Sequence, residues 1–178
     1  MQRLGPSHLA MLLAGGLLAA FGGTVLARAP AEPVAQQACP AAPGGVVGPT
    51  GKTIINPPGL SDPSGSGYSH GVRVGNMVYL AGETGAAPGL TEPLNLETQT
   101  RRAFAKMQTI LEAAGGSLDD LVTMTVFITD IRNAQEFTQL RAEILGRDFP
   151  GSALIGVSRL VTPDALLEIQ GVAVLRCS

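Results

Sequence analysis

The stretch FPGSALIGVSRLVTPDALLEIQGVAV, residues Phe149–Val174, decides the fold of this 178-residue chain. Alternate residues are apolar in its first half, and the run from Leu166 is apolar on both faces, so the stretch predicts two strands. Their connection carries Pro163 and Asp164, which are typical turn residues. Glu168 is the one acidic residue of the second strand, where a carboxylate is costly unless it is paired, hydrated or used. We therefore expect the function to depend on what Glu168 faces.

A β-hairpin is predicted before this stretch, over residues 71–74 and 77–81. The pair Gly75-Asn76 separates two alternating runs, and Gly-Asn in this place is a strong signal for a two-residue turn. The second hairpin strand is expected to end in a loop at residues 82–85. Residues 53–55 are the candidate for an additional short edge strand.

Two amphipathic helices and one further strand are predicted in the middle of the chain. Asn95 is a favourable N-cap for the first helix, which Gly115-Gly116 ends. Residues 133–136 form a candidate capping box for the second helix, which Gly146 ends. Residues 121–129 alternate as a strand does. The apolar stripes consist of Ala103, Phe104, Met107, Ile110, Leu111 and Ala114 in the first helix and Phe137, Leu140, Ile144 and Leu145 in the second.

These elements follow one another in the order β-β-α-β-α-β-β, which predicts an α+β fold. Two helices can cover one face of such a mixed sheet. The last strand also carries apolar residues on its other face, Val172 and Val174 among them. Because an uncovered apolar sheet face needs a partner, we predict a homo-oligomer whose sheets pack together.

Composition favours a small-molecule function over nucleic-acid binding. The net charge of −2 gives no basic excess that would attract nucleic acid or a membrane surface. Tryptophan is absent and aromatic residues make up only 4% of the chain, so a platform for stacking bases is not expected. The two histidines and two cysteines are far apart in the sequence and predict no metal site, and no cofactor is expected.

The N-terminal residues are predicted to be a signal peptide, over residues 1–29. Arg3 supplies the positive charge, residues 9–26 are apolar, and small-residue cleavage sites follow. An uncleaved membrane anchor is the alternative. A linker rich in Pro, Ala and Gly is expected over residues 30–51, and the globular domain over residues 52–176. The protein is thus expected to be exported, to a bacterial periplasm or beyond, and to meet the membrane only through the signal segment.

Cys39 and Cys177 lie near the two ends of the exported chain. In an oxidising compartment a disulfide between them is plausible, and two thiols that stay free or pair between molecules are an equal alternative.

Short motifs spread over most of the chain carry a resemblance to a known family. The motifs are Gly67-Tyr68-Ser69-His70, residues 78–82, 100–101, 111–115, 117–120 and 125–130, Gly156-Val157-Ser158-Arg159-Leu160 and Leu167-Glu168-Ile169. Together they resemble the RidA family, which is also called YjgF and was once described as an L-PSP endoribonuclease. The resemblance covers about residues 52–175.

This resemblance implies a chorismate-mutase-like fold, a homotrimer and ligand clefts between subunits. It implies the hydrolysis of short-lived enamines and imines, such as 2-iminopropanoate, to 2-oxo acids and ammonia. In the family an arginine binds the substrate carboxylate as a two-pronged pair, and a glutamate on the last strand orients the attacking water. Neither a metal nor an organic cofactor is implied.

Six positions of this chain correspond to the family's ligand cleft, among them Ala81, which stands where the family usually has a serine. Glu168 stands at the water-orienting glutamate, Tyr68 at the cleft tyrosine and Gly82 at the backbone donor near the ligand. The family arginine is replaced by Ser152, and Lys106 stands where the family has an asparagine. Loss of the arginine removes a charge-assisted pair of about 1.5–3 kcal/mol, which corresponds to roughly 10- to 150-fold weaker binding.

Lys106 is hypothesised to reach the cleft and to replace the missing charge as a single donor. The alternative is an exposed helix lysine, since Lys106 lies off the apolar stripe. Glu168 has the alternative of an ion pair with Arg159, and Tyr68 that of a packing residue. His70 is expected to be a loop residue with no carboxylate beside it.

Two functions follow from the sequence. The first is an exported hydrolase of the RidA type with an altered substrate preference. The second is a non-catalytic homologue that binds a small metabolite or acts as a chaperone-like surface. In both cases the expected partners are a small molecule and further copies of the chain, without nucleic acid.

Overall fold

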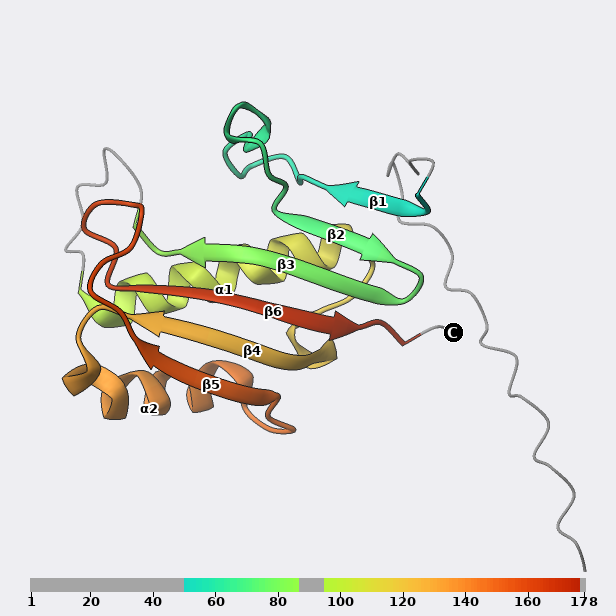
Figure 1. Cartoon of the computed structure of the whole chain (residues 1–178). Helices are drawn as coiled ribbons and strands as arrows, with labels where there is room; N and C mark the ends of the chain where they lie inside the picture. The colour runs from blue at the N-terminus through green and yellow to red at the C-terminus, as the bar shows by residue number, and fades with distance from the viewer. Residues whose placement is uncertain (1–49, 87–94, 177–178) are drawn as a thin grey trace, which may run out of the picture. The chain divides into compact units, whose positions relative to one another are not determined.

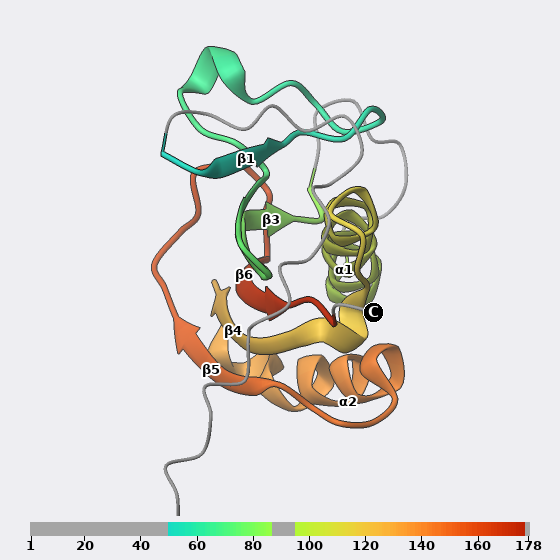
Figure 2. The same ribbon diagram turned by 90° about the vertical axis from the view of Figure 1, so that its right-hand side faces the viewer.

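The computed structural model describes residues 50–86 and 95–176, which form one sheet with two helices on one of its faces (Figures 1 and 2). The predicted signal segment, the linker up to residue 49, Cys39 and Cys177 lie outside the described residues. Within the described residues, no helix is long and apolar enough to cross a membrane.

The sheet has six strands in the order β1-β2-β3-β6-β4-β5. The strands are β1 Lys52–Ile55, β2 Gly71–Val74, β3 Met77–Thr84, β4 Leu121–Ile128, β5 Gly151–Gly156 and β6 Leu167–Val174. Neighbours are antiparallel except β4 and β5, which are parallel. The predicted mixed α+β fold is confirmed, and the candidate edge strand is present as β1.

The two helices are α1, Leu96–Ala113, and α2, Ala134–Leu145. Asn95 caps α1 as predicted, because its side chain accepts a hydrogen bond of 2.8 Å from the Thr98 amide. The capping box predicted for α2 is wrong. Asn133 makes no side-chain capping bond, because the short 3₁₀ helix η3, Ile131–Asn133, runs directly into α2.

The core lies between the helices and one face of the sheet. Phe104, Met107 and Ile110 of α1 are buried as predicted, and they pack with alternate residues of the central strand β6, such as Leu167 and Ile169. Each fully buried side chain of this size contributes about 1.5–3 kcal/mol of transfer free energy. Since side chains alternate along a strand, the intervening residues of β6 point to the opposite face.

The opposite face of the sheet carries no helix in the described part of the chain (Figure 2). Exposed apolar side chains on it include Ile54, Val74, Met77, Tyr79 and Ile155. On β6, Val172 and Val174 lie on this face as expected, and the polar residues Glu168 and Gln170 precede them on the same face.

Candidate active site

A cavity of about 450 Å³ opens where the β1–β2 connection, the end of β3, α1 and the start of β6 meet. Four of the five site residues predicted from the sequence line it: Tyr68, Gly82, Lys106 and Glu168. His70 and Glu83 are among the lining residues that were not predicted. Segments far apart in the sequence therefore meet at one site.

A β-bulge near the end of β3 shapes this cavity. Leu80 pairs with Gly171 and Glu83 pairs with Ile169, so two residues of β3, Ala81 and Gly82, face a single residue of β6. The extra residue shifts the inside–outside alternation by one position. As a result Glu83 is buried, at 3% exposure, although the alternation of Val78 and Leu80 would have placed Gly82 inward.

Gly82 leaves the space that the Glu168 side chain occupies. A β-carbon at position 82 would lie 1.9 Å from Glu168 Oε1 and 2.7 Å from its Cδ. Any side chain at this position would therefore overlap the carboxyl group. The absence of a side chain at position 82 is thus a requirement of the observed Glu168 conformation.

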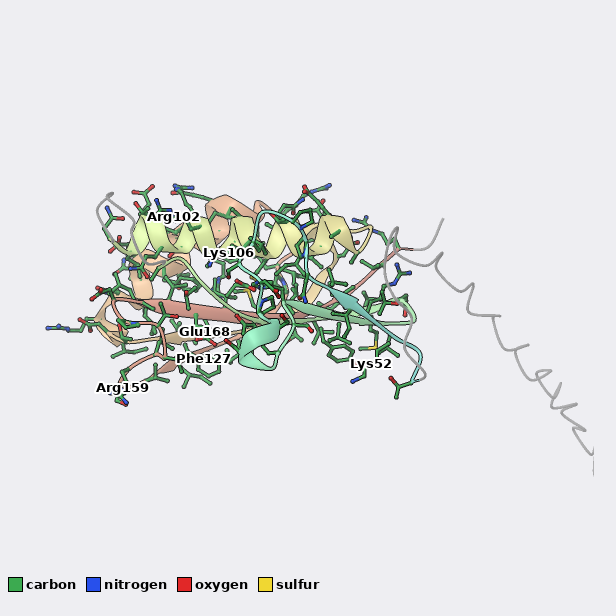
Figure 3. All side chains as sticks on the ribbon, turned by 90° about the horizontal axis from the view of Figure 1, so that it is seen from above. Lys52, Arg102, Lys106, Phe127, Arg159 and Glu168 are labelled. Atoms are coloured by element: carbon green, nitrogen blue, oxygen red, sulfur yellow. The ribbon has the colours of Figure 1, made fainter. Side chains whose placement is uncertain are left out.

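Glu168 is half-buried and lines the cavity. It pairs with Phe127 across β4 and β6, which places an aromatic side chain beside it. Burial, and then the charge of Glu83, raise the pKa of the Glu168 carboxyl above its usual range. Among the described residues no ion pair joins Glu168 to Arg159, and Figure 3 shows Arg159 well apart from it. This carboxyl group can therefore meet a ligand in the cavity.

Lys106 reaches the cavity from α1. Its Nζ donates a hydrogen bond of 2.8 Å to the Thr84 carbonyl and lies 3.9 Å from Glu83 Oε2. The Lys106 side chain is 30% exposed and lines the cavity. The arrangement brings one cation and two carboxyl groups into the wall of one cavity.

His70 has a carboxylate beside it, so the expectation for this residue is wrong. Its Nδ1 lies 2.5 Å from Glu83 Oε1, and its Nε2 lies 2.8 Å from the Ser61 carbonyl oxygen. Both side chains of the His70–Glu83 pair are 4% exposed. The sequence carried no signal for this pair, because the bulge that turns Glu83 inward follows from the register of β3 and β6.

Tyr68 lies at the mouth of the cavity and is 47% exposed. Its ring meets the His70 ring edge to face, with 5.9 Å between the ring centroids. The Tyr68 ring is thus held against His70, and about half of its surface stays open to a ligand.

Ser152 lies away from this cavity within one copy of the chain. It is exposed on β5, and its Oγ accepts a hydrogen bond of 2.9 Å from Arg141 Nη1. Ser152 pairs with Met124 of β4, whereas Glu168 pairs with Phe127 on the other side of the same strand. Usual strand spacing and rise then put the two backbones roughly 14 Å apart.

No group of three or more His, Cys, Asp or Glu residues that could hold a metal ion occurs among residues 50–86 and 95–176.

Comparison with known proteins gives consistent matches. The family model described as Endoribonuclease L-PSP matches residues 61–175. A RutC family protein from Saccharolobus solfataricus is 36% identical over 108 residues, which are 60% of this chain and 85% of that protein. A protein named 2-iminobutanoate/2-iminopropanoate deaminase, from Dermatophagoides farinae, is 30% identical over 126 residues, which are 70% of this chain and 97% of that protein.

Solved structures match in the same region. A member of the YjgF/YER057c/UK114 family from Mycobacterium tuberculosis superimposes with a TM-score of 0.62 at 31% identity, over 70% of this chain and 99% of that one. A protein of unknown function from Pseudomonas aeruginosa gives a TM-score of 0.66 at 28% identity, over 71% and 94% of the two chains. The fold described above is that of these structures.

Proposed function

Since the chain belongs to the Endoribonuclease L-PSP family, also known as RidA or YjgF, we propose that it is an enzyme of the deaminase type. In this proposal it hydrolyses small enamines or imines to a carbonyl product and ammonia. The relative from Dermatophagoides farinae bears the name of such a deaminase. The observation that carries the proposal is the half-buried Glu168 carboxyl, which shares a cavity with the Lys106 ammonium group.

Glu168 is the acid and the base of the proposed reaction. In its acid form it donates its proton to the imine nitrogen, and the resulting carboxylate takes a proton from the water whose oxygen bonds to the imine carbon. A second transfer from Glu168 to the nitrogen lets ammonia leave as the C–N bond breaks. The proton of the new hydroxyl returns to Glu168 as the carbonyl forms. The raised pKa of Glu168 supports this role, because its acid form persists to higher pH.

Lys106 binds the carboxylate of the substrate in this proposal, and Gly82 and Tyr68 form the walls beside it. Lysine offers a point charge where an arginine offers a planar fork, so the orientation of the substrate is less tightly defined. Since Ser152 stands where the family has its arginine, we expect a substrate preference that differs from that of other members. By degenerate site we mean this loss of the family arginine at Ser152.

The alternative function is a non-catalytic homologue that binds a small metabolite or acts as a chaperone-like surface. The observation that favours it is Ser152, whose hydroxyl is engaged by Arg141 and whose side chain has no charge to offer a carboxylate.

Self-association and export complete the proposal. The exposed apolar side chains on the open sheet face support self-association, for which the family resemblance implies a homotrimer with clefts between subunits. The charged and apolar pattern of residues 1–29 supports export to a bacterial periplasm or beyond. The net charge of −2 supports a small molecule rather than nucleic acid as partner.

The test is ammonia release from 2-iminopropanoate that is generated in situ. The purified protein should accelerate release, and Glu168→Gln should lose about 10²–10⁴-fold of that acceleration while keeping its fold by circular dichroism. No acceleration by the wild type, combined with saturable binding of 2-oxopropanoate, would favour the non-catalytic alternative.

A further inference from the structure

The buried His70–Glu83 pair is the closest side-chain contact at the cavity, and the proposed reaction gives it no role. The position of His70 is fixed on all sides. Its amide donates to Asn56 Oδ1 at 2.9 Å, its carbonyl accepts from the Ala81 amide at 2.8 Å, and both ring nitrogens have partners. The ring therefore has one orientation, and Glu83 Oε1 is held against it.

The partners of the ring fix how many protons the pair carries. The Ser61 carbonyl oxygen can only accept, so His70 Nε2 must carry a hydrogen. The contact of 2.5 Å between Nδ1 and Glu83 Oε1 then requires one proton between these two atoms. With that proton on either atom, His70 and Glu83 together bear no net charge.

Lys106 lies on the other side of the same carboxyl group. Its Nζ is 3.9 Å from Glu83 Oε2, so the ammonium group and this carboxyl group attract each other at the edge of the cavity. An ammonium group has three N–H donors. One donates to the Thr84 carbonyl, and Nζ lies 3.9 Å from Glu83 Oε2, which is an ion-pair distance rather than a hydrogen bond, so N–H donors remain for a ligand in the cavity.

We propose that Glu83 and His70 are positioning residues, which hold the Lys106 ammonium group at the cavity so that it binds the carboxylate of a small 2-imino or 2-oxo acid. The shared proton fixes the Glu83 carboxylate, and this carboxylate and the Thr84 carbonyl restrain a side chain that otherwise samples many rotamers. The inference rests on the proposed function for the class of ligand, but not on catalysis.

The wild-type protein provides the first test. It has two lysines, and Lys52 on β1 is exposed, so it serves as an internal reference for a freely rotating side chain. In protein labelled with ¹³C at lysine Cε, we expect two distinct methylene proton shifts for Lys106 and one averaged shift for Lys52. We also expect one proton resonance far downfield of the amides that couples to the His70 ring nitrogen. Averaged methylene shifts for Lys106 would overturn the proposal.

The second test measures binding of 2-oxopropanoate by NMR titration, which needs no turnover. Glu83→Gln, which keeps the shape and removes the charge, should weaken binding about three- to tenfold and should abolish the downfield resonance. His70→Gln should weaken binding in the same direction. Equal or tighter binding by Glu83→Gln would overturn the proposal, because Glu83 would then compete with the ligand for Lys106.

Asp120→Asn is the matched control. Asp120 is also a buried carboxyl group with a cationic partner, Arg176 at 3.0 Å, but it does not line the cavity. This variant should lower the melting temperature and leave the binding of 2-oxopropanoate unchanged. A protein without deaminase activity whose binding depends on Glu83 would refute the proposed function alone. If the enzyme is active but Glu83→Gln binds 2-oxopropanoate as tightly as the wild type does, the positioning role alone is refuted.

Discussion

Replacing Gly82 by alanine should disable Glu168 without unfolding the protein. The new β-carbon would lie 1.9 Å from Glu168 Oε1, and real β-carbons do not approach other heavy atoms closer than 3.0 Å. The carboxyl oxygen must therefore move by at least about 1.1 Å. Because a displacement of about 1 Å at a reacting group can cost roughly 10²-fold in rate, we expect a loss of about that size in kcat/KM.

The stability of Gly82→Ala should change little, because the atoms in conflict belong to the mobile end of a half-buried side chain. Gly85→Ala is the contrasting control. There a β-carbon would lie 2.1 Å from the main-chain oxygen of Gln99, which cannot move without displacing α1. We expect Gly85→Ala to lower the melting temperature by several degrees, as overpacking of about 1–3 kcal/mol implies.

The assay is ammonia release from 2-iminopropanoate, with thermal unfolding measured in parallel. A partial rescue is expected in the double variant Gly82→Ala with Glu168→Asp, since the shorter acid leaves room for one methyl group. If Gly82→Ala keeps kcat/KM within about threefold of the wild type, the carboxyl group does not act from the position described here.

Three further predictions concern stability and assembly. The pKa of Glu168 is raised in the folded state, so ionisation of this carboxyl group lowers the stability of the fold as the pH rises through that pKa. Glu168→Gln, which cannot ionise, should therefore raise the melting temperature near neutral pH and have little effect near pH 4. Calorimetry at both pH values tests this. Tyr79→Glu, on the open sheet face, should convert the expected trimer to smaller species in sedimentation velocity, and an unchanged mass would contradict packing through this face. Asn95→Ala should cost about 1 kcal/mol of unfolding free energy and Asn133→Ala much less, because only Asn95 caps its helix; equal losses in urea titration would contradict the capping assignment.

Periodic features of the sequence predicted the fold well. The apolar stripe of α1 and the alternation of β6 have regular spacing, and each places its residues on the correct side of the core. The position of Glu168 on the open side of β6 follows from the same alternation. The family resemblance pointed to Tyr68, Gly82 and Lys106, which line the cavity with it, and to Ser152, which does not.

The parts that sequence reasoning missed depend on breaks in this regularity. The bulge at Ala81 and Gly82 looks like the end of a strand in sequence, yet β3 continues to Thr84. That single extra residue turns Glu83 inward against His70, so neither residue could be assigned from spacing. The capping box at residues 133–136 failed for a related reason, since the 3₁₀ turn before α2 gives Asn133 a backbone conformation that an N-cap does not adopt.

The most direct measurement for this account is the division of effects between kcat and KM in Glu168→Gln and Lys106→Gln, with 2-iminopropanoate as substrate. If Glu168 transfers protons and Lys106 binds the substrate carboxylate, Glu168→Gln should lower kcat with little change in KM. Lys106→Gln should raise KM about tenfold or more and lower kcat much less. An unchanged KM in Lys106→Gln, or an unchanged kcat in Glu168→Gln, would contradict the assignment of this cavity as the active site.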